Sequence, residues 1–101
     1  MADTNTKRRT ETVLKPARPP LHKVILINDD FTPREFVVRL LKAEFRVPEA
    51  QALGIMLTAH TKGACVVAVF TKEVAEEKST RAIEAARDKG YPLLFTTEPE
   101  E

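Results

Sequence analysis

Few side chains in this sequence are reactive or able to bind an ion. An amide and two carboxylates follow one another at Asn28-Asp29-Asp30, an imidazole is supplied by His60, and the single thiol is Cys65. Acyl transfer needs a nucleophile beside a base, and Cys65 lies in an apolar run, where a buried thiol is inert. Two adjacent carboxylates without further spaced ligands are a weak signal for a metal site. We therefore predict a protein that is not an enzyme and that holds no metal or other cofactor. An enzyme that used the thiol would lose its activity on Cys65→Ser.

The same residues also have ordinary structural explanations. Asn and Asp are common in turns, because their side chains bond to their own backbone. A histidine in the last turn of a helix is favoured by the helix macrodipole, which accounts for His60 without any ligand. The residue types alone therefore leave both a binding site and a plain turn open.

The composition is that of one small globular domain preceded by a basic arm. The chain has 101 residues, 43% of them hydrophobic and 31% charged, which suffices for one core but not for two. Residues 1–20 carry five basic side chains, two acidic ones and three prolines, and they offer too little apolar surface to offset the entropy of ordering. We predict a flexible basic arm over 1–20 and a folded core over 21–101.

Charge and hydropathy limit the classes of function. The formal net charge is +1 and the basic excess lies in the arm, so the core lacks the broad basic surface that neutralises many phosphates. A ribosome- or RNA-associated module that uses the arm is the alternative function. No apolar run approaches the roughly 20 residues that span a membrane, and no apolar leader is present. A single cysteine cannot form an internal disulfide, so we expect a cytoplasmic protein.

A strand, a turn and a helix are predicted around the Asn-Asp-Asp run. The aliphatic run 24–27 does not alternate with polar residues, which is typical of a strand that is covered on both faces or central in a sheet. After the turn, Thr32 is expected to be the helix N-cap, with Pro33 in the first helical position and Glu35 completing a capping box. This helix is expected to run to about Arg46.

The rest of the core continues with two helices and two strands. Proline begins the next helix and glycine ends it, while the short valine-rich run after that glycine favours a buried strand over a helix. The predicted elements are a helix over 48–62 that ends at Gly63, a strand over 64–70, a helix capped by Thr71 and stopped by Gly90 and Pro92, and a strand over 93–97.

The resulting order, β-α-α-β-α-β, predicts an α+β fold in a single two-layer domain. A helical crossover joins the second and third strands in parallel, and the slot between them suits the first strand, antiparallel to both. We therefore expect a split β-α-β arrangement: a three-stranded antiparallel sheet with three helices on one face.

Four separated blocks of residues also match one protein family. The blocks are the segment from Lys23 to Pro33 with Glu35-Phe36-Val37, Met56-Leu57-Thr58-Ala59-His60 with Gly63, Val69-Phe70-Thr71 with Glu73-Val74-Ala75-Glu76 and Lys78, and Tyr91-Pro92-Leu93-Leu94. In their order and spacing they resemble the ClpS family of N-end rule adaptors, which bind an N-degron, the exposed N-terminal residue of a protein, and deliver that protein to an AAA+ unfoldase for degradation. The resemblance covers about residues 20–97 and implies the same β-α-α-β-α-β fold.

The resemblance also implies where a substrate would bind. It assigns Asn28, Asp29 and His60 to the free α-amino group of the substrate. It places around the first side chain a hydrophobic pocket formed by Thr32, Arg34, Val37, Met56, Ala59 and Leu93. The chemistry is consistent, because an α-ammonium group has three N–H donors, which an Asn carbonyl, a carboxylate and a neutral imidazole nitrogen can accept.

Two positions depart from the commonest pattern of the family. Arg34 stands where many members carry methionine over the pocket, and Ala59 stands where valine is frequent. A guanidinium group can stack on an aromatic ring but gains little from leucine, while alanine enlarges one wall. The expected substrates begin with a bulky hydrophobic residue, foremost Phe, Tyr or Trp, and also Leu.

Glu73 and Lys78 resemble the family's docking surface for the N-terminal domain of a ClpA- or ClpC-type unfoldase. An ordinary exposed helix face would also carry such residues, since a carboxylate like Glu73 is favoured at a helix N-terminus. The implied partners are N-degron proteins and the unfoldase, with no nucleic acid and no membrane.

Overall fold

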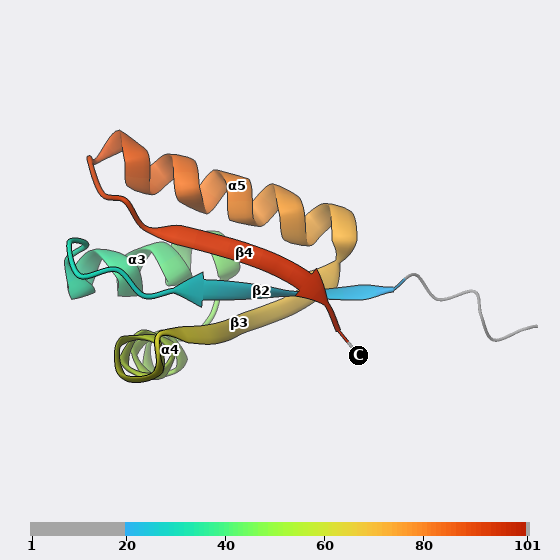
Figure 1. Cartoon of the computed structure of the whole chain (residues 1–101), viewed down its shortest axis with the longest axis horizontal. Helices are drawn as coiled ribbons and strands as arrows, with labels where there is room; N and C mark the ends of the chain where they lie inside the picture. The colour runs from blue at the N-terminus through green and yellow to red at the C-terminus, as the bar shows by residue number, and fades with distance from the viewer. Residues whose placement is uncertain (1–19, 101) are drawn as a thin grey trace, which may run out of the picture.

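The computed structural model describes residues 20–100, so the arm predicted over 1–20 lies outside the described residues except for Pro20. The elements, labelled as in Figure 1, are β2 (Leu21–Ile27), α3 (Arg34–Phe45), α4 (Glu49–Lys62), β3 (Ala64–Thr71), α5 (Lys72–Asp88) and β4 (Leu94–Pro99). This order confirms the predicted β-α-α-β-α-β fold. Within residues 20–100, no helix is long and apolar enough to cross a bilayer.

The sheet has the predicted topology, with the first strand in the middle. Its order is β3-β2-β4, and β2 pairs antiparallel with both neighbours. The central place of β2 explains its aliphatic run, but one face of the sheet is open. Val66 of β3 and Leu94 of β4 keep 43% and 50% of their surface exposed. Within β2, however, the consecutive residues Val24, Ile25 and Leu26 are all buried, so both faces of the central strand are covered and the exposure lies on the edge strands.

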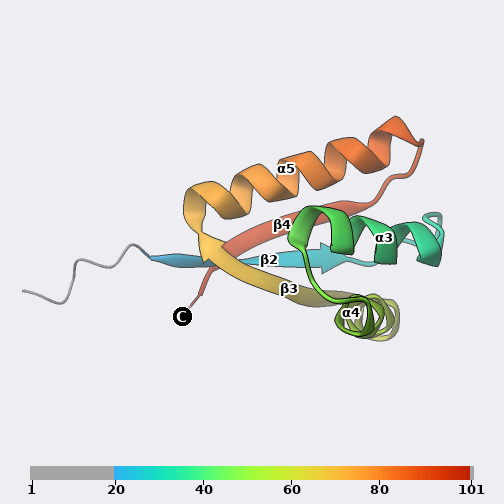
Figure 2. The ribbon, with the colours of Figure 1, turned by 180° about the vertical axis from the view of Figure 1, so that it is seen from behind.

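The core lies between the sheet and the helices. Figures 1 and 2 show α3 and α5 on one face of the sheet, with α4 beside the start of β3 and seen nearly end-on. Alanines bring α5 close to the strands, since Ala75, Ala82 and Ala86 are fully buried. Phe45 at the end of α3 packs between the rings of Phe70 and Phe95, with centroids 6.3 and 5.4 Å away. This aromatic stack joins α3 to both edge strands.

The predicted capping box at the start of α3 is wrong. The helix begins at Arg34, one residue later than expected, and the N-cap is Pro33, which has an extended backbone (φ −62°, ψ 141°) and no side-chain cap bond. The hydroxyl of Thr32 donates instead to Oδ2 of Asp29. The carboxylate three residues earlier is the stronger acceptor for this hydroxyl, so Thr32 closes the turn before the helix rather than capping the helix itself.

The other two helix starts follow a related pattern. Pro48 is the N-cap of α4 and not its first helical residue, again with an extended backbone. Thr71 occupies the N-cap of α5 as predicted, although its side chain makes no cap hydrogen bond. At the other end of α4, Gly63 adopts φ 95° and ends the helix, which confirms the predicted stop.

Candidate functional site

The turn after β2 and the end of α4 meet at one end of the sheet. The backbone N–H of Asn28 donates to the carbonyl of Gly63 at 2.9 Å, directly beyond the last β2–β3 pair, Ile27 with Ala64. Because Gly63 also ends α4, this bond brings the last turn of α4, which carries His60, beside the Asn-Asp-Asp turn. Two segments far apart in the sequence thus share one rim.

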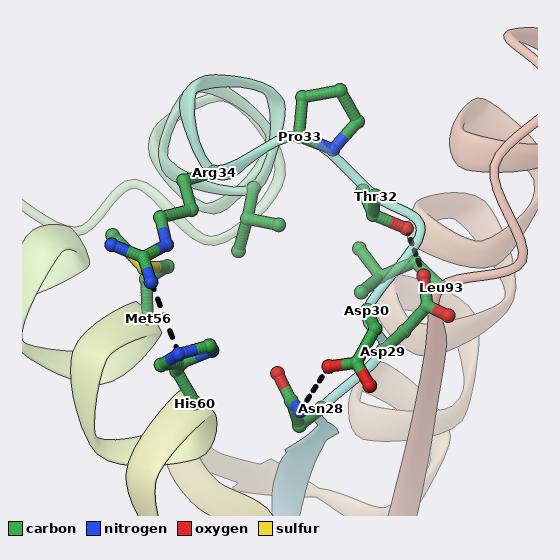
Figure 3. A pocket seen from close by; sticks show the side chains of 10 residues that line it. Asn28, Asp29, Asp30, Thr32, Pro33, Arg34, Met56, His60 and Leu93 are labelled. Carbon is green, nitrogen blue, oxygen red and sulfur yellow. Dashed lines mark hydrogen bonds between the residues drawn. The ribbon is translucent and has the colours of Figure 1, made fainter.

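A pocket of about 310 Å³ opens at this rim (Figure 3). Its lining residues are Asn28, Asp29, Asp30, Thr32, Pro33, Arg34, Val37, Met56, His60 and Leu93. Eight of the nine residues that the sequence assigns to the α-amino group and the first side chain are among them. The ninth, Ala59, is 1% exposed in the core and does not line this pocket in the described chain.

Apolar side chains form the floor of the pocket. Val37 from α3, Met56 from α4 and Leu93 from the segment before β4 are all buried, and Thr32 is buried beside them. The volume is at the lower end of the roughly 300–1,000 Å³ that is typical of small-ligand sites. A floor of this size and character suits one apolar side chain rather than a long segment.

One side of the rim carries an amide and two carboxylates. Nδ2 of Asn28 donates to Oδ1 of Asp30 at 3.4 Å, and the amide oxygen points toward the cavity in Figure 3. The bond from Thr32 holds one carboxylate oxygen of Asp29. Fixed carbonyl and carboxylate oxygens of this kind favour a ligand that is a hydrogen-bond donor and carries positive charge.

The opposite side of the rim carries His60 and Arg34. Nη2 of Arg34 lies 3.0 Å from Nε2 of His60, and both side chains are exposed. Figure 3 shows this pair across the pocket from Asn28 and Asp29, with the cavity between them. The imidazole predicted as a ligand group is thus in place and already has one hydrogen-bond partner.

An ion pair joins the two helices that carry Arg34 and His60. Nζ of Lys42 on α3 lies 2.8 Å from Oε1 of Glu49 in the first turn of α4. The hydrogen bond from Lys42, followed by its positive charge, lowers the pKa of the Glu49 carboxyl. Lowering this pKa keeps the carboxylate ionised to more acid pH, so the pair persists until the pH falls below the ordinary range of a glutamate.

Two lining residues were missing from the predicted site. Asp30 follows Asp29 in the same turn, and its place in an unbroken polar run was the signal available. Pro33 lines the pocket because it ends the turn as the N-cap of α3. Its sequence signal was interpreted only in terms of the helix.

The two residues predicted to dock an unfoldase lie away from the pocket. Glu73, in the first turn of α5, lines a hollow with Pro20, Thr71 and Lys72, at the end of the sheet where β2 begins. Lys78 is half-buried, and its Nζ donates to the carbonyl of Glu44 at 3.1 Å. The ammonium also lies 5.6 Å from the ring centroid of Phe70. Lys78 therefore helps to join α5 to the end of α3.

Proteins of one family resemble this chain in sequence and in fold. A family model described as ATP-dependent Clp protease adaptor protein ClpS matches residues 17–96. The adapter protein ClpS 1 of Bradyrhizobium diazoefficiens is 68% identical over the whole of both chains. ClpS 1 of Rhodopseudomonas palustris is 65% identical over 98% of this chain and 96% of its own. The solved structure of Agrobacterium tumefaciens ClpS2 bound to L-phenylalaninamide superimposes with a TM-score of 0.80 at 51% identity, covering 82% of this chain and 100% of that one.

Proposed function

This chain belongs to the ClpS family of adaptors of the ATP-dependent Clp protease, and we propose that it captures proteins by a free, bulky hydrophobic N-terminal residue and delivers them to a Clp unfoldase. One observation supports this proposal above the others: a single pocket joins an apolar floor to a rim of carboxylate, amide and imidazole groups. An N-terminal residue presents the matching pair, an apolar side chain next to an ammonium group.

The α-amino group would bind at the rim. Asn28 and Asp29 supply oxygen acceptors on one side and His60 a nitrogen acceptor on the other. An α-ammonium group has three N–H donors and loses its water on binding, so it needs about this number of acceptors. Asp30, on the same rim, adds a second negative charge that favours a cation.

The first side chain would enter the floor between Val37, Met56 and Leu93. ClpS2 of Agrobacterium tumefaciens, which is bound to phenylalaninamide, supports an aromatic residue there. We infer Phe, Tyr, Trp and Leu as the acceptable first residues. In this assignment Thr32 contributes to the wall, while Ala59 lies behind it in the core and does not touch the substrate.

Replacing the N-terminal Phe of a model peptide by Gly is the direct test of this function. Burying a large apolar side chain contributes about 1.5–3 kcal/mol, so the glycine peptide should bind roughly tenfold to a hundredfold more weakly. Fluorescence anisotropy with two labelled peptides that differ only in the first residue measures the ratio. Equal affinities would contradict the proposal. Preferential binding of RNA, weakening steeply as salt rises, would favour a nucleic-acid module instead.

We further propose that the N-terminal domain of a ClpA- or ClpC-type unfoldase docks on the first half of α5. Glu73 is exposed there and free to meet a partner's basic group, while Lys78 is held against Glu44 and Phe70. The surface lies at the opposite end of the sheet from the pocket. A substrate and the unfoldase would therefore bind without competing for space.

Alanine variants at these two positions should behave differently. Glu73→Ala should weaken binding of the unfoldase domain and leave the protein folded, with a stability loss well under about 1 kcal/mol from the helix N-terminus. Lys78→Ala should weaken it too, but also lower the free energy of unfolding by about 1 kcal/mol, because it removes a hydrogen bond and a cation–π contact. Calorimetric titration and urea unfolding measure the two effects. Glu84→Ala, on an exposed part of the same helix, is the matched control. Full affinity in Glu73→Ala would contradict this docking surface.

A further inference from the structure

The side chain of Arg34 lies between two cavities. One is the pocket of Figure 3; the other is a groove of about 340 Å³ between α3 and α4, whose walls include Glu35, Val38, Glu49 and Leu53. Arg34 and Met56 line both. The guanidinium group extends toward His60, so it lies on the pocket side and not over the carboxylates of the groove.

The contact between Arg34 and His60 determines which group donates the hydrogen bond and which accepts it. A guanidinium group is always protonated and can only donate, so Nε2 of His60, 3.0 Å from Nη2, must be the acceptor. The imidazole is then neutral, with its proton on Nδ1. A neutral imidazole has one donor and one acceptor nitrogen, and here the acceptor is already taken.

An α-ammonium group, like the guanidinium group of Arg34, needs the acceptor nitrogen of His60. Both groups only donate, and a neutral imidazole has a single acceptor whichever nitrogen carries the proton. Two cations around one imidazole would also repel each other. His60 can therefore serve Arg34 or an N-terminal ammonium group, but not both at once.

We propose that Arg34 is an internal competitor for the α-amino group, and that it must leave His60 for the groove before a substrate binds. This inference rests on the proposed function. The groove offers the guanidinium group apolar walls for its stem, Val38 and Leu53, and the carboxylate of Glu35 for its head. Glu49 in the same groove is already paired with Lys42, and Arg39 also lines it, so the groove holds Arg34 mainly through its stem and Glu35. Leaving His60 costs the same free energy for every substrate, so Arg34 lowers all affinities by one factor. A substrate with a small first side chain gains too little from the apolar floor to offset this cost, while one with a large apolar side chain still binds.

The variant Arg34→Met removes the donor and the charge but keeps an apolar stem of similar length. A net hydrogen bond of ordinary strength corresponds to about threefold to tenfold in affinity, so both L-phenylalaninamide and L-leucinamide should bind tighter by that factor. The ratio between the two affinities should stay as in the unaltered protein. Arg81→Met, on α5, removes the same charge from a side chain that lines neither the pocket nor the groove and should change neither affinity.

The outcomes separate the possible roles of Arg34. A gain for leucinamide alone would show that Arg34 stacks on aromatic rings and would overturn the competition. Equal binding of both amides to the variant and the unaltered protein would overturn the inference and leave the proposed function intact. If neither amide bound either protein, the proposed function would fail and the inference with it.

Nuclear magnetic resonance of the ligand-free protein gives a second, independent readout. In the unaltered protein the ring of His60 should carry its proton on Nδ1, and adding phenylalaninamide should shift the guanidinium signals of Arg34. Arg34→Met should lose the preference for that tautomer. A His60 ring protonated on Nε2 in the free protein could not accept from Arg34, and finding it would overturn the inference.

Discussion

Acetylating the α-amino group of a Phe peptide should weaken its binding by on the order of a hundredfold or more. Acetylation removes the positive charge and most of the donors, and it leaves Asn28, Asp29 and His60 facing a methyl group. Hydrogen bonds to charged groups each contribute roughly 1.5–3 kcal/mol, so losing two accounts for this factor. The apolar floor is unchanged, which confines the loss to the rim. Competition against a labelled Phe peptide measures it.

Variants of His60 show whether the loss arises where we place it. His60→Ala should weaken the free peptide by part of that factor and should hardly affect the acetylated one, because the histidine then has no ammonium group to bind. Leu57→Ala, on the same helix and 44% exposed, is the matched control. If the acetylated peptide bound as tightly as the free one, the recognition of a free N-terminus would be refuted.

The sequence predicted most of the fold because its signals are local and repeated. Gly63 needs no tertiary contact to end α4, since it accepts φ 95° without strain. The aliphatic run of β2 and the valine-rich run of β3 mark strands by composition, and the count of reversals leaves one arrangement of the sheet. These features can be predicted because they depend on the spacing of apolar residues along the chain and on the residue types at the turns.

The capping of α3 could not be predicted, because two local bonds compete for one hydroxyl. Thr32 can cap a helix or donate to Asp29, and both options involve residues three positions away. A sequence pattern such as Thr-Pro-Arg-Glu does not show which bond forms. The turn is also tied to a distant segment, because Asn28 at its start donates to Gly63, 35 positions further along the chain, and no local pattern shows that bond.

The site itself was predicted from resemblance, but the state of Arg34 was not. Its partner His60 is 26 positions away and belongs to another helix. An exposed arginine has many rotamers, and only the packing of α3 beside α4 shows that an imidazole lies within reach. Ala59 illustrates the same limit: the sequence places it one residue before His60, but the helix turns its methyl group into the core.

The pocket depends on a small core, and Leu41 is central to it. Leu41 lies on α3, is 0% exposed, and is among the largest fully buried side chains of the described domain. The same helix carries Arg34 and Val37, which line the pocket two turns and one turn before Leu41. A domain of this size has little stability to spare, since its folded surface is large relative to its core.

Leu41→Ala should lower the free energy of unfolding by about 2–5 kcal/mol, the range for a buried leucine whose removal leaves a cavity. Leu57→Ala should cost well under about 1 kcal/mol, because its side chain is already half in water. Urea unfolding of the two variants at one temperature measures the difference. Leu41 does not line the pocket, so the fraction of Leu41→Ala that stays folded in the cold should bind a Phe peptide with nearly unchanged affinity. Equal stability losses in the two variants would show that α3 is not held by the core, and a lost affinity in the folded fraction would show that the wall of the pocket moves with this side chain.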